Sequence, residues 1–154
     1  MGNDIHEGGC LCGAVQYETE GNPQRVSVCH CRYCQLRTGS ALGVSVYFDS
    51  QALTIIRGQH QLKVHTHQTE SGNHIEFQFC KECGTTILWN AELFSEMSGV
   101  GGGTFDPPTF WYDIEREVFS RSKADFIHID VEDRCDDAPY YKPVIDEHTR
   151  LNGS

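Results

Sequence analysis

Residues 79–84 read Phe79-Cys80-Lys81-Glu82-Cys83-Gly84, which places two cysteines on one tight turn and a glycine after it. A turn of this form is typical of a zinc knuckle. Its two thiolates can bind one metal ion, and the glycine allows the backbone conformation that presents them. A knuckle supplies only two ligands, whereas a structural zinc site needs four. We therefore expect two further ligands from elsewhere in the chain.

Most of the other cysteines also lie in tight clusters. These clusters are Cys10-Leu11-Cys12 and Cys29-His30-Cys31-Arg32-Tyr33-Cys34, and Cys135 alone stands apart. Disulfide-bonded domains usually spread their cysteines, because a bridge constrains the chain most when it closes a long loop. The clusters therefore favour metal ligands over disulfides.

Cys10 and Cys12 are candidates for the two missing ligands of the knuckle. If this segment is extended, side chains at positions i and i+2 project to the same side. Pairing these cysteines with Cys80 and Cys83 would close a site of four thiolates and couple metal binding to folding. The spacing also allows a different pairing, in which Cys10 and Cys12 bind a metal with two of the three central cysteines.

The central cluster offers three thiolates, from Cys29, Cys31 and Cys34. Three protein ligands with an exchangeable fourth position are typical of a catalytic zinc ion. A thiol that enters this position would be held as a nucleophilic thiolate at neutral pH. The alternative is a second structural site, in which Cys135 or His30 supplies the fourth ligand.

Polar residues around the central cluster are candidates for contacts with a substrate. His30 lies between two of the cysteines, where a role behind the ligands or toward a substrate suits it better than ligation, unless it is a plain surface histidine. Arg32 and Arg37 could hold a carboxylate, and Ser40 could add a hydroxyl donor. The catalytic candidates are therefore Cys29, His30, Cys31 and Cys34, and the substrate-binding candidates are Arg32, Arg37 and Ser40.

Composition indicates one ordinary globular domain. The chain has 154 residues, of which 38% are hydrophobic and 22% are charged, and this size allows a real core. The formal net charge of −10 would repel a phosphate backbone, so we expect no nucleic-acid partner. Residues 1–7 contain no basic cluster or apolar run, so we expect no signal peptide, no membrane anchor and a cytoplasmic location. The sequence favours no particular oligomeric state.

The pattern of apolar residues predicts a mainly β fold. Short alternating stretches, typical of half-buried strands, occur at residues 14–18, 43–48, 53–56, 61–65, 75–79, 85–89 and 126–129. One short helix is predicted from Arg32 to Arg37, ending at Gly39. The Gly101-Gly102-Gly103 run predicts a close approach of strands that leads into a turn. We expect a domain at residues 5–130, followed by an acidic tail at 131–154 that packs on it or is partly disordered.

The order of these motifs resembles one known family. The residues that carry the resemblance are Gly9-Cys10-Leu11-Cys12-Gly13-Ala14-Val15, Cys29-His30-Cys31 with Cys34, Thr38-Gly39-Ser40, and Phe79-Cys80 with Cys83-Gly84. They resemble the glutathione-dependent formaldehyde-activating enzymes, or S-(hydroxymethyl)glutathione synthases, a family that includes centromere protein V. The resemblance extends from about residue 5 to residue 130.

The resemblance implies coiled β-sheets with a zinc-ribbon-like element and two zinc ions. It places Cys10, Cys12, Cys80 and Cys83 on a structural zinc, and Cys29, Cys31 and Cys34 on the zinc of the active site. It implies that the sulfur of glutathione adds to formaldehyde at that site, and that the reverse carbon-sulfur lyase reaction is also possible. The segment Glu117–Phe126 looks like the closing strand of the family, although Phe126 stands where a tryptophan is common.

The enzyme interpretation has two alternatives from other functional classes. The chain could be a non-enzymatic zinc module that binds a thiol metabolite or a protein partner. It could also be a redox sensor, because three crowded thiolates that lose their metal can form a disulfide. Measurable glutathione binding without catalysis would favour the first alternative, and release of zinc by mild peroxide would favour the second.

Overall fold

The computed structural model describes residues 4–145 and 151, and its architecture is mainly β. The strands in chain order are β1 (Ile5–Gly9), β2 (Gln16–Glu20), β3 (Arg25–Cys29), β4 (Gly43–Asp49), β5 (Leu53–Arg57), β6 (Leu62–Gln68), β7 (His74–Cys80), β8 (Thr86–Ala91), β9 (Met97–Gly101), β10 (Arg116–Val118) and β11 (Asp133–Arg134). The single α-helix among the described residues is α1 (Arg32–Thr38). Short 3-10 turns are η1 (Ser50–Ala52), η2 (Gln59–Gln61), η3 (Glu92–Phe94), η4 (Gly102–Thr104) and η5 (Ser120–Ser122).

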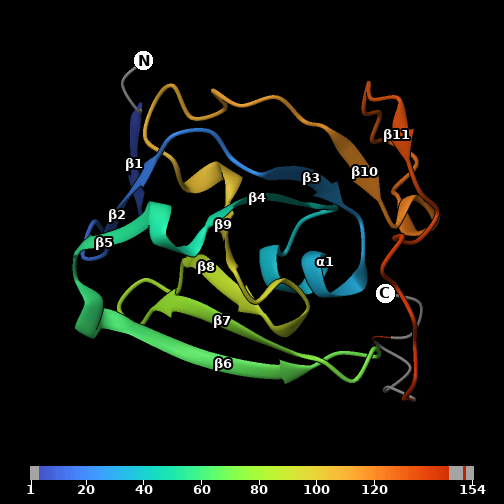
Figure 1. Ribbon diagram of the computed structural model, residues 1–154, viewed down its shortest axis with the longest axis horizontal. Helices are drawn as coiled ribbons and strands as arrows, with labels where there is room; N and C mark the ends of the chain where they lie inside the picture. Colours follow the sequence, from blue (N-terminus) through green and yellow to red (C-terminus); the bar gives the residue numbers. More distant parts are fainter. Residues whose placement is uncertain (1–3, 146–150, 152–154) are drawn as a thin grey trace.

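The strands form two sheets (Figure 1). The smaller sheet has the order β1-β2-β5 and is antiparallel. The larger sheet has the order β11-β10-β3-β4-β9-β8-β7-β6, in which β10 runs parallel to both of its neighbours and all other pairs are antiparallel. Because β3 and β10 are parallel and far apart in sequence, residues near 117 lie next to the central cysteine cluster.

The core lies on one face of the larger sheet. Val26, Val46, Val100 and Leu88 are paired from strand to strand across β3, β4, β9 and β8, and all four are buried. Tyr17, in the smaller sheet, belongs to the same buried cluster, so this core joins the two sheets. Burial of apolar surface at this junction is the main stabilising contribution to the fold.

The opposite face of the larger sheet carries different residues, because successive side chains on a strand point to opposite faces. Ser27 on β3 pairs with Ser45 on β4, and both line a cavity rather than the core. The helix α1 packs across this second face. It contacts β4, and its Tyr33 ring meets His67 on β6 at a centroid distance of 5.2 Å.

Most of the predicted elements are confirmed. The helix has the predicted start, and Gly39 ends it in a left-handed conformation with a φ of 65°. Six predicted strands correspond to β2, β4, β5, β6, β7 and β8. Gly102 marks a close approach, because a Cβ atom there would lie 2.2 Å from the Tyr112 hydroxyl oxygen.

Two predicted strands differ in the structure. Residues 126–129 form no strand, because residues 124–127 make a turn in which Ile127 donates a hydrogen bond to the Ala124 carbonyl, and Phe126 is exposed. The expected closing strand at 117–126 is reduced to β10, and the chain leaves it through η5.

A separate observation concerns membranes: within residues 4–145 and 151, no helix is long and apolar enough to cross one.

Candidate metal centres and active site

Four cysteines from two distant turns meet at one end of the sheets. The sulfur atoms of Cys10, Cys12, Cys80 and Cys83 all lie within 4.8 Å of one another. The Cys10–Cys12 sulfurs are 3.6 Å apart, and the Cys12–Cys80 sulfurs are 3.8 Å apart. Four sulfurs bound at about 2.3 Å to a tetrahedral ion would be separated by about 3.8 Å. The four-cysteine group therefore fits one metal ion with no room for a further ligand.

Each of the two turns that supply these sulfurs is closed by a hydrogen bond from a glycine amide. In one turn the Gly13 amide donates to the Cys10 carbonyl, and in the other the Gly84 amide donates to the Cys80 carbonyl. Both glycines have a positive φ, 77° and 81°, which glycine adopts without steric cost. The expectation that Cys10 and Cys12 lie on an extended segment is wrong, because β1 ends at Gly9 and the chain turns there.

Hydrogen bonds prepare part of the four-cysteine group for a metal. The Thr85 hydroxyl lies 3.2 Å from the Cys83 sulfur and lowers the pKa of that thiol to about 5, aided by backbone amides. The Val15 amide donates to the Cys10 sulfur. These donors stabilise thiolate, which is the form that binds metal.

The second group consists of Cys29, Cys31 and Cys34, whose sulfurs also lie within 4.8 Å of one another. Cys29 ends β3, and Cys34 lies in the first turns of α1. Cys31 is the N-cap of α1, and its sulfur accepts a hydrogen bond from the Cys34 amide. Cys135 packs against this cluster but does not complete it as a fourth member of the sulfur group.

The thiols of the three-cysteine group differ in their pKa. The pKa of Cys34 lies well below that of an ordinary thiol, because Cys29 and Cys31 donate hydrogen bonds to it and the Arg37 guanidinium lies beside it. The pKa of Cys29 is raised well above the ordinary value, since this thiol is the donor and is also buried. Cys34 is therefore the more acidic of these two thiols.

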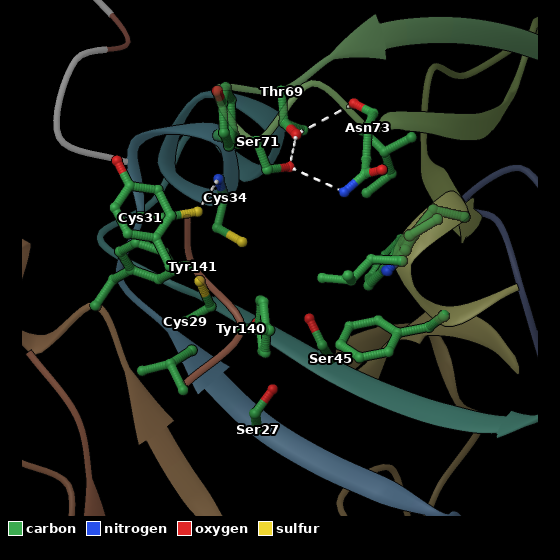
Figure 2. Close-up of a pocket in the computed structure, with 18 of the residues that line it drawn as sticks. Ser27, Cys29, Cys31, Cys34, Ser45, Thr69, Ser71, Asn73, Tyr140 and Tyr141 are labelled. Atoms are coloured by element: carbon green, nitrogen blue, oxygen red, sulfur yellow. Dashed lines mark hydrogen bonds between the residues drawn. The ribbon is translucent and has the colours of Figure 1, made fainter. Parts of the chain in front are cut away.

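A cavity of about 150 Å³ opens beside the three sulfurs (Figure 2). Its floor includes Ser27 and Ser45, and the turn between β6 and β7 forms one wall. Within that turn, hydrogen bonds join Thr69, Ser71 and Asn73. If these three thiols bind a metal ion, the open volume next to them would leave room for a fourth, exchangeable ligand, in contrast to the four-cysteine group.

A buried ionic chain lies behind the three-cysteine group. His30 is fully buried, and its Nε2 lies 2.7 Å from Glu117 Oε1. The other carboxylate oxygen of Glu117 accepts a hydrogen bond from Arg134 on β11. Burial alone would raise the pKa of Glu117, but the hydrogen bonds from Arg134 and His30 outweigh it and lower that pKa. His30 thus anchors the Cys29–Cys31 segment to β10 and does not line the cavity.

Of the three predicted substrate-binding residues, only Arg37 lies at the cavity. Arg37 lines the cavity, and its guanidinium lies 4.2 Å from the centroid of the Trp89 ring. Arg32 donates to the Gln35 side chain, and the Ser40 amide donates to the Thr38 hydroxyl. Neither Arg32 nor Ser40 is among the residues that line the cavity.

Several residues of the site were missed by the sequence reasoning. Tyr140 and Tyr141 come from the acidic tail and line the cavity, as does Glu70 from the β6–β7 turn. The tyrosine pair was a usable signal, because two adjacent aromatic residues in an otherwise polar tail indicate a point of attachment. Glu70 had no comparable signal.

Comparison with known proteins agrees with this architecture. The family described as "Glutathione-dependent formaldehyde-activating enzyme" matches residues 5–122. A Schizosaccharomyces pombe protein described as an uncharacterized lyase is 28% identical over 112 residues, which cover 66% of this chain and 74% of the relative. A crystal structure of a Rhodobacter sphaeroides protein superposes with a TM-score of 0.54 at 21% identity, covers 69% of this chain and 95% of that one, and supports the fold alone. The chain belongs to the family of glutathione-dependent formaldehyde-activating enzymes.

Proposed function

We propose that this protein is a zinc-dependent enzyme that joins a small thiol, with glutathione the expected one, to an aldehyde such as formaldehyde, and that also catalyses the reverse carbon-sulfur lyase reaction. The observation that carries the proposal is the three-cysteine group beside an open cavity. Membership of the family and the lyase description of the yeast relative support the reaction class.

The donor sets of both groups suit zinc. Four thiolates in tetrahedral arrangement are typical of zinc or iron–sulfur sites, and three thiolates with an open position are compatible with a catalytic zinc. We assign Cys10, Cys12, Cys80 and Cys83 to a structural ion, and Cys29, Cys31 and Cys34 to a catalytic one. When bound at the catalytic group, zinc would supply a position at which a thiol is held as thiolate.

The residues of the chain then have separate tasks. The sulfur of the thiol forms a bond to the carbonyl carbon, and the carbonyl oxygen takes up a proton and becomes a hydroxyl. Arg37 places a positive charge next to Cys34 and above Trp89, so it can hold an anionic part of the thiol near the cavity. The His30–Glu117 pair keeps Cys29 and Cys31 in place. In the reverse direction the hydroxyl loses its proton as the carbon-sulfur bond breaks.

The test is the rate of exchange between glutathione, formaldehyde and their adduct, measured by magnetisation-transfer NMR with catalytic amounts of the zinc-loaded protein. We expect acceleration that disappears in Cys31→Ser, because serine keeps the helix N-cap but removes one thiolate. Cys135→Ser is the matched control outside the three-cysteine group. Glutathione binding without acceleration would contradict the enzyme and favour a non-enzymatic binding module.

A further inference from the structure

The tail contributes part of the wall of the cavity. Residues 131–145 contain several acidic side chains, but two adjacent tyrosines, Tyr140 and Tyr141, line the cavity together with the three cysteines (Figure 2). Both tyrosines lie outside residues 5–122, the part of the chain that matches the family. Membership of the family therefore does not account for this part of the wall.

The beginning of the tail is fixed next to the three-cysteine group. Three successive amides that follow β10 donate hydrogen bonds to the carbonyl oxygens of residues 135–137. The pairs are Phe119 to Asp137 at 2.8 Å, Ser120 to Cys135 at 3.0 Å and Arg121 to Asp136 at 3.3 Å. Ala138, which is 3% exposed, then packs in the buried cluster that contains Cys29 and Cys31. Tyr140 packs against the same cluster, two residues further along the chain.

The tail is fixed a second time at the β6–β7 turn. The Glu70 carbonyl accepts hydrogen bonds from the amides of Val144 and Ile145, at 2.8 and 3.1 Å. The Tyr141 hydroxyl donates a hydrogen bond to the Glu70 carboxylate. The tail therefore passes from the end of β10 to the end of the β6–β7 hairpin, a course that Figure 1 also shows. Tyr140 lies between these two points of attachment.

The Tyr140 ring is held by two side chains of the domain. The Phe94 ring meets it edge to face at a centroid distance of 5.1 Å, and the Arg25 guanidinium lies 5.2 Å from its centroid. The same guanidinium lies 5.3 Å from the centroid of the Phe94 ring, so the three groups contact one another. Edge-to-face and cation–π contacts of this kind are favourable. The Tyr140 ring is therefore a defined part of the cavity wall.

Other aromatic residues of the wall belong to the larger sheet. Tyr47 on β4 and Trp89 on β8 are both buried, and Trp89 Nε1 donates a hydrogen bond to the Tyr47 hydroxyl at 3.0 Å. A change in either ring would disturb the packing of the sheet itself. Tyr140 lies in a turn of the tail, where a side chain can differ without repacking of a sheet. The tail can therefore set the size of a ligand independently of the fold.

We propose that Tyr140 is a specificity-determining residue of the active site. Its ring occupies one side of the cavity and limits the size of the substrate group that fits next to Cys29, Cys31 and Cys34. A smaller side chain at this position would extend the cavity toward the tail and admit longer substrate groups. This inference rests on the proposed function and names a residue that restricts the substrates of the same site.

Binding of straight-chain alcohols measures the available length without any reaction. Ethanol, butanol, hexanol and octanol are titrated into the zinc-loaded protein in a calorimeter. Affinity should rise about fourfold for each methylene group that is buried, and it should stop rising when the chain exceeds the cavity. The chain length at which affinity levels off is the length limit of that protein.

Replacement of Tyr140 tests whether its ring sets this length limit. In Tyr140→Ala the limit should move to alcohols that are longer by at least about two carbons. Tyr140→Phe keeps the ring and should leave the limit where it is. Phe126→Ala removes a ring at a position that is 81% exposed and does not line the cavity, so it should also leave the limit unchanged. An unchanged limit in Tyr140→Ala, or an equal shift in Phe126→Ala, would overturn the proposal.

Tyr140→Trp provides a test in the opposite direction. The larger ring should shorten the length limit by at least about one carbon, because it takes up part of the cavity. Circular dichroism checks that each variant folds. If Tyr140→Ala does not fold, Tyr140→Trp still decides the question, since an unchanged limit in this variant would equally contradict the role of the ring.

The reaction then shows which substrate meets Tyr140. In one series glutathione is paired with formaldehyde, propanal and hexanal, and in the other formaldehyde is paired with ethanethiol and hexanethiol. In one of the two series, Tyr140→Ala should raise the acceleration of the longest member relative to the shortest at least about 10-fold. The series that responds identifies the substrate whose group lies against the tail. A response in neither series would overturn the proposal.

The outcomes separate this inference from the proposed function. If glutathione and formaldehyde are accelerated but Tyr140→Ala changes neither the alcohol limit nor the two series, the proposed function stands and the present inference is overturned. If no pair is accelerated while the alcohol limit still moves in Tyr140→Ala, the proposed function fails. Tyr140 would then limit the size of the ligands of a non-catalytic binding protein.

Discussion

The two cysteine groups use the same ligand chemistry but are assembled differently. The four-cysteine group joins two turns that are distant in sequence, since Cys12 and Cys80 are 68 residues apart. The three-cysteine group comes from residues 29–34, at the end of β3 and the start of α1. The first group can form only when the two sheets are in place, whereas the second needs one strand end and one short helix.

Their surroundings differ as well. Four sulfurs within 4.8 Å of one another could complete a tetrahedral metal site, while three sulfurs would leave one position that faces a cavity. Under the proposed function, the number of thiolates and the space next to them, rather than the kind of ligand, would separate a stabilising metal site from a reactive one. This comparison can be tested by changing one member of each group.

The largest effect is expected for Cys80→Ser in the four-cysteine group. Cys80 is fully buried, and its replacement removes one of the four assigned metal ligands, whose binding we expect to be coupled to folding. We expect the melting temperature to fall by more than about 10 °C, corresponding to a loss of more than about 3 kcal/mol. Calorimetry and native mass spectrometry would measure this change. A Cys80→Ser protein that keeps its stability with one fewer metal would show that the group does not support the fold.

A smaller effect on stability and a larger one on activity are expected for Cys31→Ser. Serine is a good N-cap, so α1 should persist and the melting temperature should change by only a few degrees. The bound metal should fall from two ions to one, and exchange between thiol and aldehyde should slow by more than about 100-fold. Cys31→Ala would add a loss of about 1 kcal/mol from the missing cap. If Cys31→Ser unfolds the protein, the functional division between the two groups is wrong.

Local patterns were enough to predict much of the fold. Alternation in segments such as residues 43–48 and 75–79 identified β4 and β7, and Gly39 marked the end of α1. These features depend on neighbours in sequence, which a pattern can display. The C-x-x-C pairs Cys31–Cys34 and Cys80–Cys83 were also predictable, because this spacing reflects the geometry of a single turn. The spacing left the pairing of Cys10 and Cys12 with Cys80 and Cys83 open, and only the family resemblance implied it.

Long-range contacts could not be predicted in the same way. The pairing of β10 with β3 brings Glu117 to His30 across 87 residues, and neither position carries a signal that names the other. Glu70 belongs to the site only because the β6–β7 hairpin places its turn near α1 and the tail. The turn at Cys10–Gly13 was missed for a different reason, since its cysteines are also compatible with an extended segment.

The ionic chain behind the three-cysteine group gives the third prediction. Glu117→Gln removes a buried charge that His30 and Arg134 share. Charged hydrogen bonds of this kind contribute about 2 kcal/mol, so we expect the melting temperature to fall by about 5 °C. The three-cysteine group should bind its metal more weakly while the four-cysteine group keeps its own. Equal loss of metal from both groups, measured by competition with a chelator, would contradict the local role of His30.

The smallest effect is expected for Arg37→Gln. The Arg37 guanidinium stacks over Trp89 and lies 3.9 Å from the Cys34 sulfur, so it favours the thiolate and stabilises the cavity wall. Its removal should cost about 1 kcal/mol through the lost cation–π contact and should raise the Michaelis constant for glutathione several-fold. Arg37→Lys keeps the charge but not the planar stacking, so it should restore part of the binding.

Because Arg37 belongs only to the three-cysteine group, a change in the metal bound at the four-cysteine group would mean that the two sites are coupled. If the lysine variant behaves like the glutamine variant, stacking on Trp89 rather than charge is what Arg37 contributes.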